Sequence, residues 1–157
     1  MDARSDALSS LAPLFRVRPE LQHVCRFGHA WASPHPPEPD NWAPFHVVTG
    51  GACVLHLTAS QRSIPLKVGD VAVLPRGSAH AVHGTATSAT ATGPFGIGTR
   101  SNGAILVKSN TDGPPDAQLV CGRLKFDHAG QNLVLSALPE AIVVAAADRV
   151  RRIMCSD

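Results

Sequence analysis

Thirteen glycines and thirteen prolines are spread at short intervals through this chain of 157 residues. Proline removes a backbone donor and clashes with the preceding helical turn. Helices much longer than about three turns therefore do not fit between most of these breaks. Short strands do fit. The spacing predicts an all-β protein, less than about a quarter helical, with short helices only near its two ends.

Runs of apolar and β-branched residues recur between the breaks. Residues 45–57 indicate two strands joined as a hairpin at Thr49-Gly50-Gly51, because glycine supplies the positive φ of a tight turn. The other runs that favour strands are 64–68, 71–74, 79–83, 104–108, 119–126 and 141–144. Residues 45–83 should therefore form consecutive strands of one barrel.

The remaining segments favour loops and terminal helices. The proline-rich residues 33–41 cannot form a central strand. Residues 85–103 are small, polar and rich in glycine, which is typical of a surface loop or a weak edge strand. One helix is expected near the start, capped by Ser5, and another from about Ala146.

Size and charge restrict the possible classes of protein. A chain of 16.5 kDa predicts one domain, residues 1–157. A net charge of only +2 argues against a strongly basic nucleic-acid binder. Apolar stretches of under about 10 residues fall short of the roughly 20 needed to span a bilayer, and the start lacks the pattern of a secretory signal. The expectation is a cytoplasmic protein without membrane contact.

Residues 69–80, GDVAVLPRGSAH, fit the pattern G-x5-P-x-G-x2-H. Gly69 begins a turn, a buried strand follows, Pro75 to Gly77 make a second sharp turn, and His80 starts the next strand. A histidine placed there would point into a barrel. This segment resembles the second motif of the cupins.

Further features resemble the N-terminal cupin domain of AraC-type transcriptional regulators over about residues 6–150. The combination of FHVV at 45–48, GDVAVLPRGSAH at 69–80 and CGRLKFDH at 121–128 carries this resemblance. It implies a double-stranded β-helix, the jelly-roll barrel of the cupins. In that family the domain senses a small molecule and governs a DNA-binding module.

Two departures from the family pattern affect the expected function. The stretch that matches the first cupin motif, residues 41–46, keeps only His46 and has Pro44 near the position of a glutamate, which argues against a three-histidine, one-glutamate site. The sequence to Asp157 contains no helix-turn-helix module, so this chain should not itself bind DNA specifically. The apolar half of residues 141–153 suggests a homodimer.

Histidine and cysteine supply the candidate metal ligands. Imidazole and thiolate suit zinc or nickel. His46, His80 and Cys121 are the favoured ligands, with His128 or Cys53 as the fourth. The alternative is that they only pack or form hydrogen bonds, as buried free cysteines commonly do. The histidines without a spacing partner are expected to be exposed or structural: His23, His29, His35, His56 and His83.

The sequence supports three functional hypotheses. The leading one is a ligand-sensing cupin domain, possible metal dependence included. The second is a small metal-dependent cupin enzyme, an oxygenase or isomerase. The third is a degenerate dimerisation domain that binds nothing. Loss of the H-x-H pair and the glutamate favours the first over the second, because a redox-active iron site needs a facial set of ligands with open positions.

Overall fold

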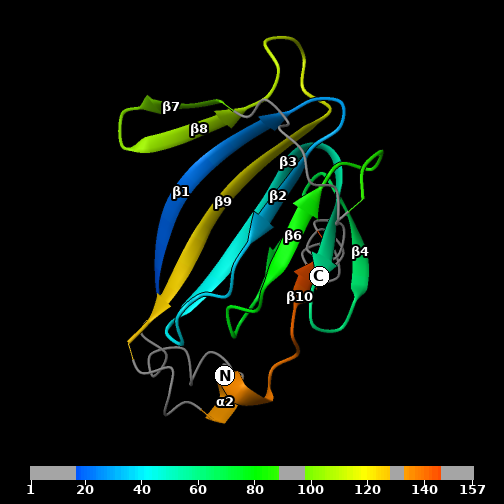
Figure 1. The fold of residues 1–157 in the computed structure, drawn as a ribbon. Helices are drawn as coiled ribbons and strands as arrows, with labels where there is room; N and C mark the ends of the chain where they lie inside the picture. The colour runs from blue at the N-terminus through cyan, green and yellow to red at the C-terminus, as the bar shows by residue number, and fades with distance from the viewer. Residues whose placement is uncertain (1–16, 89–97, 128–132, 146–157) are drawn as a thin grey trace, which may run out of the picture.

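The computed structural model describes residues 17–88, 98–127 and 133–145 (Figure 1). Ten strands and one short helix lie in these residues. The elements are β1 (Val17–Phe27), β2 (Ala32–His35), β3 (Trp42–Leu57), β4 (Arg62–Lys67), β5 (Val71–Val73), β6 (His80–His83), β7 (Gly98–Asn102), β8 (Ile105–Ser109), β9 (Ala117–Phe126), α2 (Leu133–Ala137) and β10 (Ile142–Val144). The predicted all-β class is confirmed.

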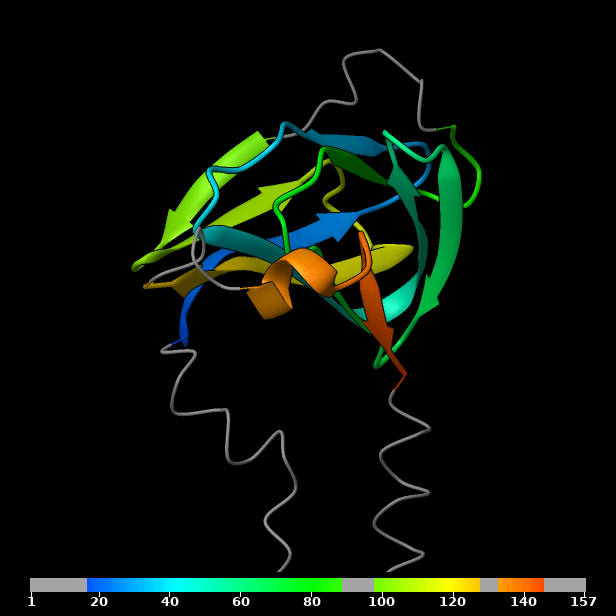
Figure 2. The same ribbon diagram turned by 90° about the horizontal axis from the view of Figure 1, so that it is seen from below.

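The strands form one curled sheet. Its main path runs β10-β5-β3-β9-β1-β8-β7, while β4 and β6 pair with β3, and β2 pairs with β6. Figures 1 and 2 show the strands curling around a common interior, with α2 at one end. Strands far apart in sequence thus face one another across the core. Among the described residues, no helix is long and apolar enough to cross a bilayer.

The predicted hairpin at residues 49–51 is wrong. The structure has one continuous strand, β3, whose first half pairs with β9 and β5 and whose second half pairs with β4 and β6. The register against β9 shifts between Val48 and Gly50, which marks a bulge. Gly51 has φ of 68°, and a Cβ there would lie 1.7 Å from the Asp116 carbonyl oxygen. The two glycines therefore bend the strand from one part of the sheet into the other.

The other expected strands between residues 62 and 144 are present with small changes at their ends. β1 was not expected, because its first half is exposed and only Cys25 and Phe27 are buried in it. β2 lies in the proline-rich segment and pairs only with β6, as an edge strand would. The helices expected near the two ends lie outside the described residues.

The interior of the barrel is a single large apolar cluster. It includes Phe27, Trp31 and Leu119, with the rings of Phe27 and Trp31 4.5 Å apart. Three of its members are thiols, those of Cys25, Cys53 and Cys121. Buried histidines interrupt this apolar interior at one place. That place is the candidate site.

The segment expected to form a dimer begins in β10. Val143 and Val144 are 37% and 45% exposed. The rest of residues 141–153, from 146 onward, lies outside the described residues. The homodimer therefore stays a prediction.

Candidate functional site

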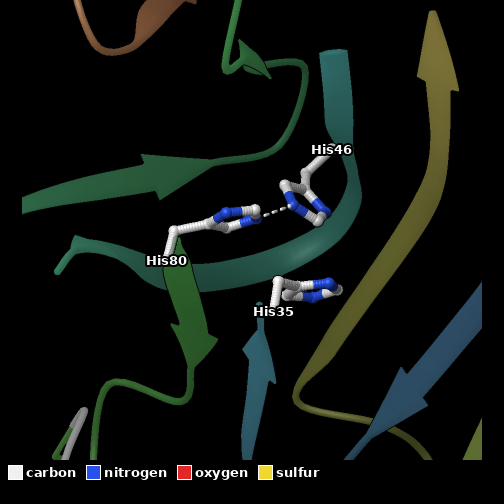
Figure 3. Close-up of side chains that lie close together, drawn as sticks. All are labelled: His35, His46 and His80. Atoms are coloured by element: carbon white, nitrogen blue, oxygen red, sulfur yellow. Dashed lines mark hydrogen bonds between the residues drawn. The ribbon is translucent and has the colours of Figure 1, made fainter. Parts of the chain in front are cut away.

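Three histidines from three strands meet inside the barrel (Figure 3). His46 lies in β3, His80 begins β6 after the turn at Gly77, and His35 ends β2. His35 and His80 are direct cross-strand partners between β2 and β6. Their rings therefore stack, with centroids 4.7 Å apart and planes within 5°. Sheet register brings these two side chains together.

The nitrogens of the three imidazoles are close enough to share one ion. His46 Nε2 lies 2.8 Å from His80 Nε2, and one nitrogen from each of the three rings lies within 4.8 Å of the others. Neighbouring donors in a tetrahedral zinc site lie about 3 to 4 Å apart, so a small closure of the rings would suffice. The donor set fits zinc or nickel.

A chain of hydrogen bonds fixes the ring orientations. His80 Nδ1 donates to the Ser78 carbonyl oxygen at 2.8 Å, because a carbonyl only accepts. The Nε2 of neutral His80 then accepts from His46 Nε2–H, and His46 Nδ1 accepts from the Cys121 thiol at 3.0 Å. His46 thus contacts His80 and Cys121 through opposite edges of its ring.

Burial keeps the three imidazoles neutral. The pKa of His46 lies well below its ordinary value of 6.5, first because of burial and then because of the neighbouring His35 and His80. Burial, with smaller effects from His80, Lys108 and His23, lowers the pKa of His35 to about 3. Burial also lowers the pKa of His80. Neutral imidazole is the form that binds metal ions.

The other sequence candidates have different positions. Cys121 touches His46 at Nδ1, the ring edge opposite His80. Cys53 lies in the apolar core, where burial and then the charge of Asp70 raise the pKa of its thiol to about 12, so it holds its proton. His128 lies outside the described residues.

Sequence reasoning missed His35. It lies among prolines and has no histidine at a regular spacing, yet the β2–β6 register places it opposite His80. A strand prediction for residues 32–35 paired with 80–83 would have been the signal. His83 is buried and its Nδ1 donates to the Gly84 carbonyl oxygen, a structural role. His56 bonds Ser63 at the surface.

Two spaces of different size adjoin the histidines. An open cleft of about 430 Å³ is lined by His35, His80 and residues of β2, β3, β6 and the loop after β3. An inner crevice of about 10 Å³ is lined by His35, His46, both Cys25 and Cys121, and apolar side chains. The cleft has the size of a small-molecule site, whereas the crevice holds no more than about one water or ion.

The fold and the histidine cluster together define the class of the protein, a small β-barrel with imidazoles in its interior. Residues 6–155 match the family described as Cupin, so the chain belongs to the cupins. It is 28% identical over 145 residues to an uncharacterized HTH-type transcriptional regulator of Haemophilus influenzae. The match covers 91% of this chain and 46% of that regulator, so the chain spans about half the length of its relative.

Solved structures give a similar result at lower identity. The protein YhaK from Escherichia coli has a TM-score of 0.45 and 13% identity, over 85% of this chain and 45% of YhaK. ToxT from Vibrio cholerae, in a structure with bound unsaturated fatty acid, has a TM-score of 0.43 and 9% identity, over 88% of this chain and 44% of ToxT. The family match confirms the predicted cupin fold, and the Haemophilus regulator agrees with the predicted resemblance to a regulator's cupin domain.

Proposed function

We propose that this chain is the small-molecule-sensing cupin domain of a transcriptional regulator of the AraC type. We further propose that a zinc or nickel ion held by His35, His46 and His80 contributes to ligand binding. The observation that carries the proposal is that three neutral imidazoles converge where an open cleft meets the barrel interior.

The shape of the site supports this function. His35 and His80 line the cleft, so a ligand there could contact the metal centre directly. The remaining lining combines apolar and polar groups, including Pro34, Thr58 and Gln61. A cleft of about 430 Å³ with a few polar groups is typical of sites for small organic molecules. When bound, the metal would supply a Lewis-acidic centre that orients an oxygen or nitrogen of the ligand.

Calorimetric titration of chelator-treated protein with Zn²⁺ and Ni²⁺ tests the metal part. We expect one ion per chain, and affinity about 100-fold weaker in His35→Ala and His80→Ala, since each removes a direct ligand. His56→Ala is the matched control, because His56 lines the same cleft without joining the cluster. Full affinity in His35→Ala would contradict the proposed ligand set.

Sensing is tested separately by screening small molecules for thermal stabilisation of the metal-loaded and metal-free protein. A sensing domain should bind one chemical class and release it unchanged. Compounds that stabilise the wild type should lose their effect when Thr58→Trp fills the cleft. Stabilisation that survives this substitution would place the ligand elsewhere.

A metal-dependent cupin enzyme is the second candidate. The histidines border an open cleft, and catalytic metal sites combine three protein ligands with a free position. Among the described residues no carboxylate belongs to the cluster, although the charge of Glu38 reaches His80. Conversion of a bound compound by the metal-loaded protein, lost in His80→Ala, would favour the enzyme over the sensor.

A further inference from the structure

Two thiols lie side by side on the inner side of His46. Cys25 in β1 pairs with Leu119 of β9, and His23, two residues earlier, pairs with Cys121. Cys25 and Cys121 are therefore diagonal cross-strand neighbours on the same face. They are 5% and 8% exposed, and their thiols form a hydrogen bond. Both line the inner crevice.

A cation accompanies this thiol pair. Lys108 of β8 is the direct cross-strand partner of Cys25 and lines the same crevice. None of the ion pairs within the described parts of the chain includes Lys108. A half-buried ammonium group without a carboxylate beside it favours a negatively charged partner. The thiols are the ionisable groups that can supply this charge, because the histidines of the crevice are neutral or positive.

The volume of the crevice restricts what can occupy it. At about 10 Å³ it has room for one ion but not for an organic ligand. Two sulfur donors and few polar groups suit a soft metal ion of low coordination number, and thiolates select Cu⁺ among the available metals. Zn²⁺ would need four ligands, which the thiol pair does not supply.

We propose that Cys25 and Cys121 form a binding site for a single soft monovalent metal ion, Cu⁺, distinct from the histidine centre. Binding replaces the two thiol protons, which leave to solvent, with one Cu⁺. The resulting bis-thiolate complex carries one negative charge, which the Lys108 ammonium group neutralises. Nothing is oxidised or reduced in this step.

The proposed ion would also act on His46. A Cys121 thiolate accepts a hydrogen bond but donates none, so the 3.0 Å contact would require a proton on His46 Nδ1. The lone pair of His46 would then lie on Nε2, toward His80. Occupation of the thiol site thus favours the tautomer that can bind a metal in the histidine cluster.

Anaerobic titration of reduced protein with Cu⁺, in competition with bicinchoninate, tests the site. We expect one tightly bound Cu⁺ per chain with an ultraviolet sulfur-to-copper absorption. Affinity should fall by about 100-fold in Cys25→Ser and Cys121→Ser, and by about tenfold in Lys108→Met with recovery in Lys108→Arg. Cys53→Ser and Cys155→Ser are the matched controls and should bind as the wild type does.

Two further measurements keep the result decisive. X-ray absorption of the wild-type copper complex should show two sulfur ligands, so the site is tested even if a serine variant fails to fold. His35→Ala should lose Zn²⁺ binding yet keep Cu⁺, which separates this inference from the proposed function. A nitrogen-dominated copper shell, or full Cu⁺ affinity in Cys25→Ser, would overturn the inference.

Discussion

The two sides of His46 differ in almost every physical respect. On one side, His35 and His80 border an open cleft of about 430 Å³ with exposed polar groups. On the other, the ring contacts Cys121 in a crevice of about 10 Å³ walled by Phe27 and Trp31. The same imidazole therefore faces a space for molecules through one edge and a space for an ion through the other. Its two nitrogens can serve different chemistry because the barrel wall separates their surroundings.

The difference arises from the strands that build each side. The crevice lies behind β1 and β9, which pair over ten positions and pack a continuous apolar face. The cleft borders β2, a four-residue edge strand followed by prolines that cannot extend the sheet. Long paired strands close one side, and a short interrupted edge leaves the other open.

Acidification should produce the largest effect, because it acts on all three histidines. An imidazole that stays neutral when folded but binds a proton when unfolded loses stability as pH falls below about 6.5. Each such group lowers the free energy of unfolding by about 1.4 kcal/mol per pH unit. For His35, with a pKa of about 3, the loss continues over that whole window. Stability should be full above pH 6.5.

Denaturant unfolding of metal-free protein at several pH values between 7.5 and 4 measures this slope. His35→Gln should be less sensitive to pH than the wild type, because one imidazole is removed from the buried cluster. Equal stability at pH 7.5 and pH 4.5 would mean that the cluster is already solvated, and the contrast between the two sides would fail.

Truncation on the closed side comes next in size. Trp31 is 1% exposed and packs against Phe27. Trp31→Ala should cost about 3–5 kcal/mol of unfolding free energy, since it leaves a cavity in the crevice wall. Equilibrium unfolding in urea measures the loss. Pro36→Ala in the cleft is the control and should change stability by less than about 1 kcal/mol.

Thiol chemistry offers a kinetic comparison of the two sides. Cys25, Cys53 and Cys121 are buried, so the native protein should react with a bulky aromatic disulfide reagent at least about 100-fold more slowly than the unfolded chain. Thr58→Cys places a thiol in the open cleft and should react nearly as fast as the unfolded chain. Both are measured in a Cys155→Ser background. Rapid reaction of the native thiols would show that the crevice opens readily.

The smallest effect is expected at the lip of the cleft. Gln61 has φ of 55°, a conformation that glycine adopts without strain, but its side chain donates a hydrogen bond to the Thr58 carbonyl oxygen. In Gln61→Gly these contributions oppose each other, so stability should change by less than about 0.5 kcal/mol. Thermal unfolding measures it. A loss above about 2 kcal/mol would show that this loop holds the cleft in shape.

The sequence alone determined the class of fold and half of the histidine pair that matters most. Glycine and proline spacing excluded long helices, and the pattern at 69–80 placed His80 after a sharp turn at the start of a strand. His46 followed from the resemblance at 45–48. These features are local, because turns and short strands are specified by neighbouring residues.

Tertiary structure decided the rest, because cross-strand register is not local. Only the pairing of β2 with β6 places His35 opposite His80, and only the pairing of β1 with β9 places Cys25 diagonal to Cys121. Gly50 and Gly51 illustrate the same limit. Two glycines suit a hairpin turn or a bulge equally well, and β9, far along the sequence, holds the bent strand in one continuous piece.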